Sequence, residues 1–450
     1  MIRHSLALIT ALLLVPSTPL TAADVKQSGA IGDGRSDDTA AIQRAVDKGG
    51  HVTFSEGIYR ITRTIVIDLE RAGFTSLKAD GAAKIIMAGS GPAFRFVGTN
   101  EARETLAKTE SHIWNRQRMP LIDALSIEGD HAEADGIEAS GTIQLTITRT
   151  HVRRVRHGIH LVKSNRNVIL SNCHIYANSG IGIFYDDVYV HQSNITGCHI
   201  SYNLGGGVVS RAGDVRNIQI SGCDLEANMG PGAPPTANVF IDSRGSIKGT
   251  AEIAITGCTI QHTYKGSEGA NIRILGDSEE PDTSDNKKGN ITIASNVLSD
   301  VQTNIHLRSV HGVSVTGNTM WRGYKESILV EDSRDVAITS NVAGRNPRYS
   351  MKGRPTETNA VVIRNSQNVV FNANVLSRTR GASAGLTVEN GKRINITNNT
   401  IVECDGPEIH LNNVTFCRVS DCILNDPRED HPNIKTSGGT RIQISDNLTD

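Results

Sequence analysis

Residues 291–343 read ITIASNVLSDVQTNIHLRSVHGVSVTGNTMWRGYKESILVEDSRDVAITSNVA and contain one short pattern three times. In each copy apolar residues alternate with polar ones and an asparagine follows, at Asn296, Asn318 and Asn341. A second alternating run, such as IHLR or ILVE, lies between successive copies. Alternation with a period of two is the signal of a β-strand with one buried face. The stretch therefore predicts short strands rather than helices.

The pattern extends over most of the chain, with asparagine or cysteine at the marked position and spacings of 22–25 residues that are interrupted three times by insertions. Strand repeats of this period predict a parallel β-helix of about 11–13 coils, because a leucine-rich repeat of similar period needs regular leucines and a helical side. Equal positions of successive coils stack about 4.8 Å apart. The marked residues should form a ladder: Cys173, Cys198, Cys223, Cys258, Asn296, Asn318, Asn341, Asn374, Asn399, Cys422 and Asn447.

The composition agrees with one thin solenoid, which we expect over residues 24–450. The 450 residues include 43 glycines and only 4% aromatic residues, so Ile, Val and Leu must fill the interior. Lys and Arg number 46 against 47 Asp and Glu, a balance that argues against a nucleic-acid-binding protein. Adjacent ladder cysteines would be close enough for a disulfide, so a Cys173–Cys198 pair is one possibility.

The two ends of the chain predict an exported protein with one capped end. Residues 1–23 have a basic start, a ten-residue apolar stretch and small residues near Ala23, which indicates a signal peptide and a secreted or periplasmic location. No later run is apolar enough to enter a membrane. The sequence SDDTAAIQRAVDKG (36–49) predicts a capping helix within an N-terminal cap of residues 24–60. The C-terminal end has no such plug, so a neighbouring copy in a homo-oligomer would cover it or it stays exposed.

The segment VKQSGAIGDGRSDDTAAIQRAVDKGGHVTFSEGIYRI (25–61) closely resembles the opening of the pectate-lyase-like superfamily, which includes rhamnogalacturonases, polygalacturonases, epimerases and phage tailspikes. The resemblance implies a right-handed β-helix, an acidic polysaccharide as partner, and a substrate groove along the sheet that the second run forms. Asp33, Asp37 and Asp38 in this segment are interpreted as turn formers and a helix cap.

Alternation then indicates which side chains of the groove sheet point outward. In GIHLVKS, Ile159 and Leu161 face inward while His160 and Val162 face outward. We expect a first outward column of His160, Gly182, Val209, Phe240, Arg273, His306, Leu329, Val362, Thr387, His410 and Lys435. A second column should hold Val162, Phe184, Arg211, Asp242, Leu275, Arg308, Glu331, Arg364, Glu389, Asn412 and Ser437.

Charged residues concentrate on six consecutive coils of this sheet, and arginine in a groove suits carboxylates or sulfates. The predicted catalytic residues are Asp187, Asp214, Asp242, Arg273, His306 and Arg308. The predicted substrate-binding residues are Arg211, Arg244, Phe240, Glu331, Trp321 and Arg348. Insertions at 228–238, 276–290 and 344–359, together with 101–118, should form the walls.

Three functions remain open from the residues. The signature of polygalacturonases is absent, and the arginine-rich groove favours a lyase that acts by β-elimination, with Asp186, Asp187 and Asp214 as oxygen ligands for a Ca²⁺ ion. An inverting glycoside hydrolase would need two carboxyls about 6.5–9.5 Å apart, for which Asp187 with Asp214, or Asp214 with Asp242, are candidates. The third alternative is a non-catalytic, glycan-binding or adhesive β-helix.

Overall fold

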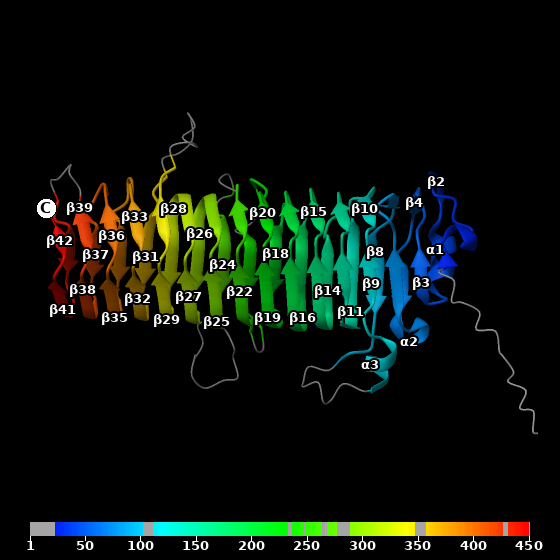
Figure 1. Ribbon diagram of the computed structural model, residues 1–450, viewed down its shortest axis with the longest axis horizontal. Coiled ribbons are helices and arrows are strands. Elements are labelled where there is room, and N and C mark those ends of the chain that lie inside the picture. Colours follow the sequence, from blue (N-terminus) through cyan, green and yellow to red (C-terminus); the bar gives the residue numbers. More distant parts are fainter. Residues whose placement is uncertain are drawn as a thin grey trace, which may run out of the picture.

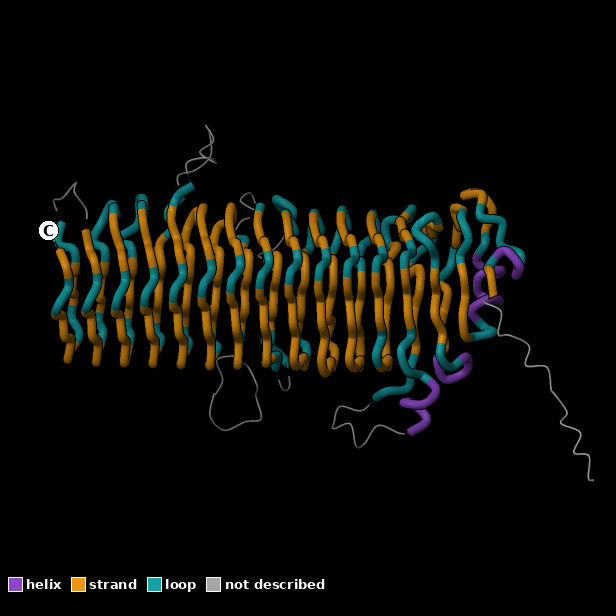
Figure 2. Tube along the Cα trace, viewed as in Figure 1, coloured by secondary structure: helices purple, strands orange, loops and turns teal. Residues whose placement is uncertain are grey.

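The computed structural model describes residues 23–101, 111–232, 236–246, 249–262, 266, 268–276, 289–346, 357–425 and 431–449. Its strands stack into one long solenoid, with helices near the N-terminal end and the C-terminus at the opposite end (Figure 1). Strands and short turns alternate along every coil (Figure 2). The predicted signal peptide lies almost wholly outside the described residues.

Parallel strand pairs build three faces, which we call A, B and C. Face A follows β1 (Ala23–Asp24), β3 (Gly50–Thr53), β6 (Thr75–Lys78), β9 (Leu121–Asp123), β12 (Thr146–Thr148), the ends of β14 (Ile159–Ser171) and β16 (Ile181–Thr196), β19 (Asp214–Ser221), β22 (Ala251–Thr256), β25 (Gly289–Ala294), β27 (His311–Thr316), β29 (Arg334–Thr339), β32 (Gln367–Asn372), β35 (Lys392–Thr397), β38 (Thr415–Ser420) and β41 (Thr440–Ser445).

Face B carries the short strands after the ladder. It follows β2 (Asp33–Asp37), β4 (Gly57–Ile61), β7 (Ala83–Met87), β10 (Ser126–Gly129), β13 (His151–Arg153), β15 (His174–Tyr176), β17 (His199–Ser201), β20 (Asp224–Glu226), β23 (Thr259–Gln261), the starts of β26 (Val297–Arg308) and β28 (Thr319–Glu331), β30 (Val342–Gly344), β33 (Val375–Ser377), β36 (Thr400–Val402), β39 (Ile423–Asn425) and β42 (Leu448–Thr449).

Face C is the predicted groove sheet. It follows β5 (Ile65–Asp68), β8 (Gly91–Val97), β11 (Ala134–Ile143), the starts of β14 and β16, β18 (Gly206–Arg211), β21 (Ala237–Asp242), β24 (Ala270–Leu275), the ends of β26 and β28, β31 (Ala360–Arg364), β34 (Leu386–Glu389), β37 (Ile409–Asn412) and β40 (Ile434–Ser437). These 14 described strands slightly exceed the expected 11–13 coils, because the first coils have no ladder residue to mark them.

The ladder lies at the corner between faces A and B, as predicted. From Asn296 to Asn399 each side-chain amide donates to the next, for example Asn318 to Asn341 at 2.9 Å. All seven cysteines are buried and none forms a disulfide, so the structure contains no Cys173–Cys198 bridge.

A second buried ladder, which the sequence did not reveal to us, runs along the corner between faces B and C. Each amide donates to the next at 2.7–2.9 Å. Its members are Asn178, Asn203, Asn228, Asn238, Asn271 and Asn304.

The N-terminal end is capped by α1 (Thr39–Val46), within the predicted segment, and Ile42, Ala45 and Val46 of this helix are buried in the core. The Asp38 side chain makes no capping hydrogen bond to α1; it accepts instead from the Ile31 N–H, which ties down the preceding loop. The other described helices are η1 (Lys26–Ser28), α2 (Leu69–Ala72) and α3 (Ser111–Arg116).

The last coil at the opposite end is uncovered in this single chain. Ile444 is 45% exposed and Leu448 is 68% exposed. Covering by a second copy therefore stays a prediction.

Candidate functional site

The outward side chains of face C form what we call the groove face. Strand pairing confirms the two predicted columns except in one coil, where Phe184 pairs with His160 and Asp186 pairs with Val162. Our placement of Gly182 and Phe184 was therefore wrong by two residues. Gly180-Ile181 and Gly182-Ile183 are the same dipeptide, so two registers satisfied the same alternation.

The middle of the groove face is closed by its own apolar side chains. Phe184, Val209 and Phe240 pack into a separate apolar cluster and are 6%, 0% and 5% exposed. Phe240 was a predicted substrate contact, but its burial leaves little surface for a ligand. The predicted groove is therefore not one continuous open surface over six coils.

Arg273 next to this cluster holds loops rather than facing solvent. Its guanidinium donates to the Thr236 carbonyl at 3.2 Å, to the Glu268 carbonyl, and to His306 Nδ1 at 3.1 Å. Burial lowers the pKa of this side chain. Arg273 thus positions two loops and His306, which differs from the catalytic role we had predicted.

We expect Arg273→Met to lower the free energy of unfolding by about 1–3 kcal/mol, because the buried Thr236 carbonyl and the part-buried Glu268 carbonyl lose a charged donor. The loops that contain Thr236 and Glu268 should also become more sensitive to protease. Denaturant unfolding and limited proteolysis measure the two effects. Arg244→Met is the matched control, since Arg244 is an exposed arginine that bonds Asp242 two residues away. Equal behaviour of the two variants would contradict the assignment.

A histidine–carboxylate pair lies on the C-terminal side of the apolar cluster. His306 Nε2 lies 3.0 Å from Glu331 Oε2, and His306 Nδ1 already accepts from Arg273. Burial lowers the pKa of His306. Arg308 is half exposed and pairs with Asp332 at 3.3 Å, so the charges at this end are largely paired within the protein.

The predicted aspartates serve different local structures. Asp214 accepts from Ser246 Oγ at 2.6 Å and from the Gly249 N–H at 3.1 Å, which fixes a turn. Asp242 pairs with Arg244 at 2.7 Å. Asp187 is exposed in a left-handed turn with φ of 42°.

The predicted calcium ligands do not form a cluster. In the parts of the chain that the structure describes, no group of three or more His, Cys, Asp or Glu side chains is arranged to hold a metal ion. The set Asp186, Asp187 and Asp214 therefore does not fit the predicted Ca²⁺ ion.

One predicted substrate contact lies on another face, and the position of a second is not described. Trp321 belongs to the part of β28 that pairs with β26 and β30 on face B, whereas Arg348 lies outside the described residues. Large parts of the insertions 276–290 and 344–359 are outside them too.

A cavity of about 810 Å³ lies at the corner between faces C and A in the N-terminal half, and we call it the turn cavity. Its lining includes Asn100, Lys163, Ser164, Asp186 and Asp187. Asn100 Oδ1 and Ser164 Oγ are buried and have no hydrogen-bond partner. Both atoms are closed off from solvent, so it is the charged side chains of the lining, Lys163, Asp186 and Asp187, that offer a place for a polar ligand.

The groove face adjoins the turn cavity through Asp186. His160 Nε2 lies 3.0 Å from Asp186 Oδ2, and the His160 ring stacks on Phe184 at 5.1 Å. Arg211 pairs in register with Asp186 and lies 5.8 Å from the centroid of the same Phe184 ring. Three groups thus lie at the cavity: the His160 imidazole, which Asp186 holds in place, and two exposed cations, Arg211 and Lys163.

His157 packs against the rings of His160 and Phe184. Its Nδ1 accepts from the Ile181 N–H at 3.2 Å, and its ring lies 5.4 Å from that of His160. Burial lowers the pKa of His157 to about 4, against the raising effect of Asp135. Asp135 is itself held by Arg156 through two bonds of 2.7 and 3.0 Å.

His157 should make folding depend on pH. Between about pH 6.5 and pH 4 the unfolded chain binds a proton at His157 that the folded chain does not. The free energy of unfolding should therefore decrease as the pH is lowered through this range. We expect His157 to contribute about 2 kcal/mol to the loss of stability from pH 7 to pH 5, and His157→Gln to remove that contribution. Denaturant unfolding at both pH values tests this, and an unchanged pH dependence in the variant would contradict it.

Known proteins resemble the chain mainly in fold. A family model described as "Right handed beta helix region" matches residues 115–247, and one described as "Periplasmic copper-binding protein (NosD)" matches residues 243–448. Comparison with curated protein sequences finds no match. No helix in the described ranges is long and apolar enough to cross a membrane.

Solved structures with similar coils include phage proteins and an enzyme module. The Dettilon tailspike protein (gp208) is 15% identical with a TM-score of 0.50, over 94% of this chain and 68% of the tailspike. Bacteriophage CBA120 tailspike protein 3 is 12% identical with a TM-score of 0.49, over 95% and 61%. The AlgE6 A-module, a mannuronan C-5 epimerase from Azotobacter vinelandii, is 15% identical with a TM-score of 0.43, over 95% and 99%. The chain spans 61% of the CBA120 tailspike and of a Geobacillus virus E2 protein. Together with the strand pairing, the "Right handed beta helix region" model and the Dettilon tailspike identify the fold as a right-handed parallel β-helix.

Proposed function

We propose that the chain is an exported enzyme that cleaves an acidic polysaccharide by β-elimination, with the reacting sugar at the turn cavity. The observation that carries the proposal is the lining of this cavity, which contains Lys163 and Asp186, the carboxylate that bonds His160. The substrate class, an acidic polysaccharide, is inferred from the resemblance of residues 25–61 to the pectate-lyase-like superfamily. The similar epimerase and tailspike structures share only the fold with this chain.

The chemistry of elimination fits the residues at hand. A base removes the C5 proton next to a uronate carboxylate, and a cation must offset the charge that develops on that carboxylate. The glycosidic C4–O bond then breaks as the C4–C5 double bond forms, and the leaving oxygen takes a proton from solvent and becomes the hydroxyl of the new reducing-end fragment. We assign the base to His160, whose Nε2 is directed to Asp186 so that Nδ1 is left to accept a proton. Arg211 and Lys163 are the candidates for binding the carboxylate, because both are exposed beside Asp186. No step in this scheme requires a metal ion.

Hydrolysis is less well supported by the same residues. Both predicted acid–base pairs contain Asp214. Its carboxylate already accepts hydrogen bonds from Ser246 and Gly249. Asp242 is likewise paired with Arg244. An inverting mechanism needs one carboxyl free to hold a water molecule.

The direct experiment incubates the purified protein with polygalacturonate, alginate, chondroitin sulfate and neutral dextran. We expect one acidic glycan to yield both new reducing ends and the ultraviolet absorbance of an unsaturated uronate. Reducing ends without that absorbance would overturn elimination in favour of hydrolysis. If neither signal changes, the enzyme assignment fails for these glycans.

A non-catalytic binder is the second candidate, and the ion pairs favour it. Arg364 bonds Glu389 at 2.9 Å and Glu331 at 3.7 Å, and Arg308 bonds Asp332. Such pairing suits a surface that recognises a glycan without reacting with it. A binder would retain a bound acidic glycan in the experiment above without producing either signal.

A further inference from the structure

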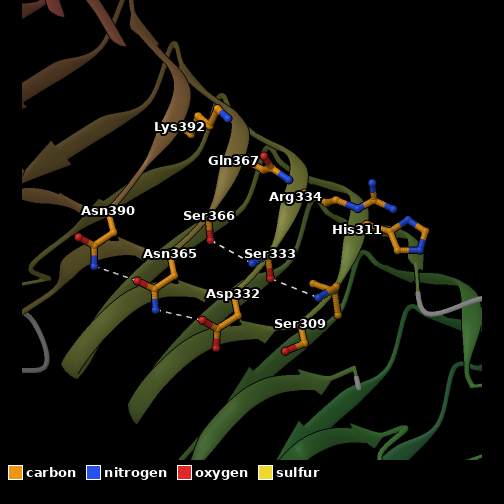
Figure 3. A pocket seen from close by; sticks show the side chains of 11 residues that line it. Ser309, His311, Asp332, Ser333, Arg334, Asn365, Ser366, Gln367, Asn390 and Lys392 are labelled. Carbon is orange, nitrogen blue, oxygen red and sulfur yellow. Dashed lines mark hydrogen bonds between the residues drawn. The ribbon is translucent and has the colours of Figure 1, made fainter. Parts of the chain in front are cut away.

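A second depression, which we call the corner groove, lies on the same corner between faces C and A but in the C-terminal half of the solenoid. Its volume is about 280 Å³. Figure 3 shows that its side chains form two rows that run across successive coils. Neither the repeat pattern nor the comparisons assign a role to this groove.

The lower row is an exposed ladder of amides that ends on a carboxylate. Asn413 donates to Asn390 at 2.9 Å, Asn390 to Asn365 at 3.0 Å, and Asn365 to Asp332 at 3.0 Å (Figure 3 shows the last two bonds). Asp332 is also paired with Arg308. Each amide uses one N–H within the ladder, so its second N–H and a carbonyl lone pair can meet hydroxyl groups.

The upper row offers donors on neighbouring strands. Arg334, Gln367 and Lys392 are paired in register on β29, β32 and β35. Gln367 Oε1 accepts from Arg393 at 2.9 Å, so the end of this amide that remains for a ligand is its NH₂ group. Guanidinium, amide NH₂ and ammonium groups are all hydrogen-bond donors, and two of them carry positive charge.

The floor between the rows takes no part in binding. Ser333 Oγ donates to the Glu331 carbonyl at 2.6 Å and accepts from the Val310 N–H at 3.2 Å. Ser366 Oγ donates to the Arg364 carbonyl at 2.7 Å and accepts from the Ser333 N–H at 3.1 Å. A ligand therefore meets the two rows, with anionic groups favoured above and hydroxyls below.

We propose that the corner groove binds a segment of an anionic polysaccharide that runs along the solenoid axis. Strands lie about 4.8 Å apart, which is close to the length of one pyranose residue. Arg334 and Lys392 are two strands apart, and an extended chain turns every second carboxylate or sulfate to the same side. The lining has no Phe, Tyr or Trp side chain on which bases could stack, which favours a glycan over a single-stranded nucleic acid. The inference shares the ligand class of the proposed function but requires no reaction.

The test measures binding of polygalacturonate, alginate and chondroitin sulfate to the full chain by calorimetry at low salt, with dextran as the neutral control. We expect the double variant Arg334→Gln/Lys392→Gln to bind its best anionic glycan at least about tenfold more weakly, since each charge-assisted contact is worth roughly that factor. The matched control Lys48→Gln/Arg418→Gln removes the same charge from exposed positions elsewhere and should bind normally. Thermal unfolding verifies that both variants fold.

Wild-type affinity in the Arg334→Gln/Lys392→Gln variant would overturn the inference, as would failure of all three anionic glycans to bind the wild type. An equal loss of affinity in the Lys48→Gln/Arg418→Gln control would show that net charge alone weakens binding, and would also overturn the inference. The proposed function fails separately: if no glycan is cleaved while the corner-groove variant alone loses binding, the corner groove stands and the enzyme does not.

Discussion

We expect His160→Ala to lose about 10²–10⁴-fold in turnover of the cleaved glycan, the usual contribution of a positioned general base. The His160 imidazole is held at the turn cavity by Asp186 of its lining, whose Oδ2 lies 3.0 Å from His160 Nε2. If His160 removes the proton, the loss should appear in kcat, while the affinity for the glycan should change little. Stopped assays of unsaturated product at saturating substrate give kcat directly.

His410→Ala provides the matched control for this prediction. His410 occupies the same outward column near the C-terminal end, and its Nε2 lies 3.1 Å from Ser437 Oγ. It should turn over the glycan like the wild type. Asp186→Asn should show a smaller loss than His160→Ala, since the amide can still bond the ring but carries no charge. A His160→Ala variant with wild-type kcat would refute the assignment of the base.

The fold was largely predictable because its information is periodic. A ladder residue every 22–25 positions fixes the corner between faces A and B, and alternation fixes which side chains are buried. The alternation did not determine the strand register at Gly180–Ile183, because the repeated Gly-Ile dipeptide fits two registers equally well. Register there is decided by burial of Tyr185, which is 0% exposed and bonds Ser193 at 2.6 Å inside the coil. Alternation alone carries no such information.

The site was less predictable because its parts come from unequal turns. Asn100 and Ser164 are brought together by the corner between faces C and A, where turn length varies from coil to coil. The column patterns gave us Arg211, and the nearby acidic residues gave Asp186 and Asp187, but neither revealed Asn100 and Ser164 in the same lining. They also gave us Arg273 as an outward residue, correctly, without showing that loop carbonyls surround it. His157 carried a signal that we passed over, namely its place next to the groove strand.

We expect Asn341→Ala to have the largest effect on stability, lowering the free energy of unfolding by about 4–5 kcal/mol. Asn341 is 1% exposed at the centre of the buried ladder. Its amide donates to the carbonyls of Val315 and Thr339 at 3.0 and 3.1 Å, and to Asn374 at 3.0 Å. Its Oδ1 accepts from the backbone N–H and from the side-chain amide of Asn318, so alanine would leave several buried groups without partners.

The exposed ladder supplies a control with the same amide geometry and a different environment. Asn390 bonds Asn365 and Asn413 at 3.0 and 2.9 Å, but water can replace both partners because all three side chains are exposed. Glycine is the suitable replacement at Asn390, since its φ of 51° disfavours a residue with a β-carbon. We expect Asn390→Gly to cost less than about 1 kcal/mol. Denaturant unfolding of both variants would then show that burial, rather than the amide bonds themselves, makes the inner ladder stabilising, and equal losses would contradict that account.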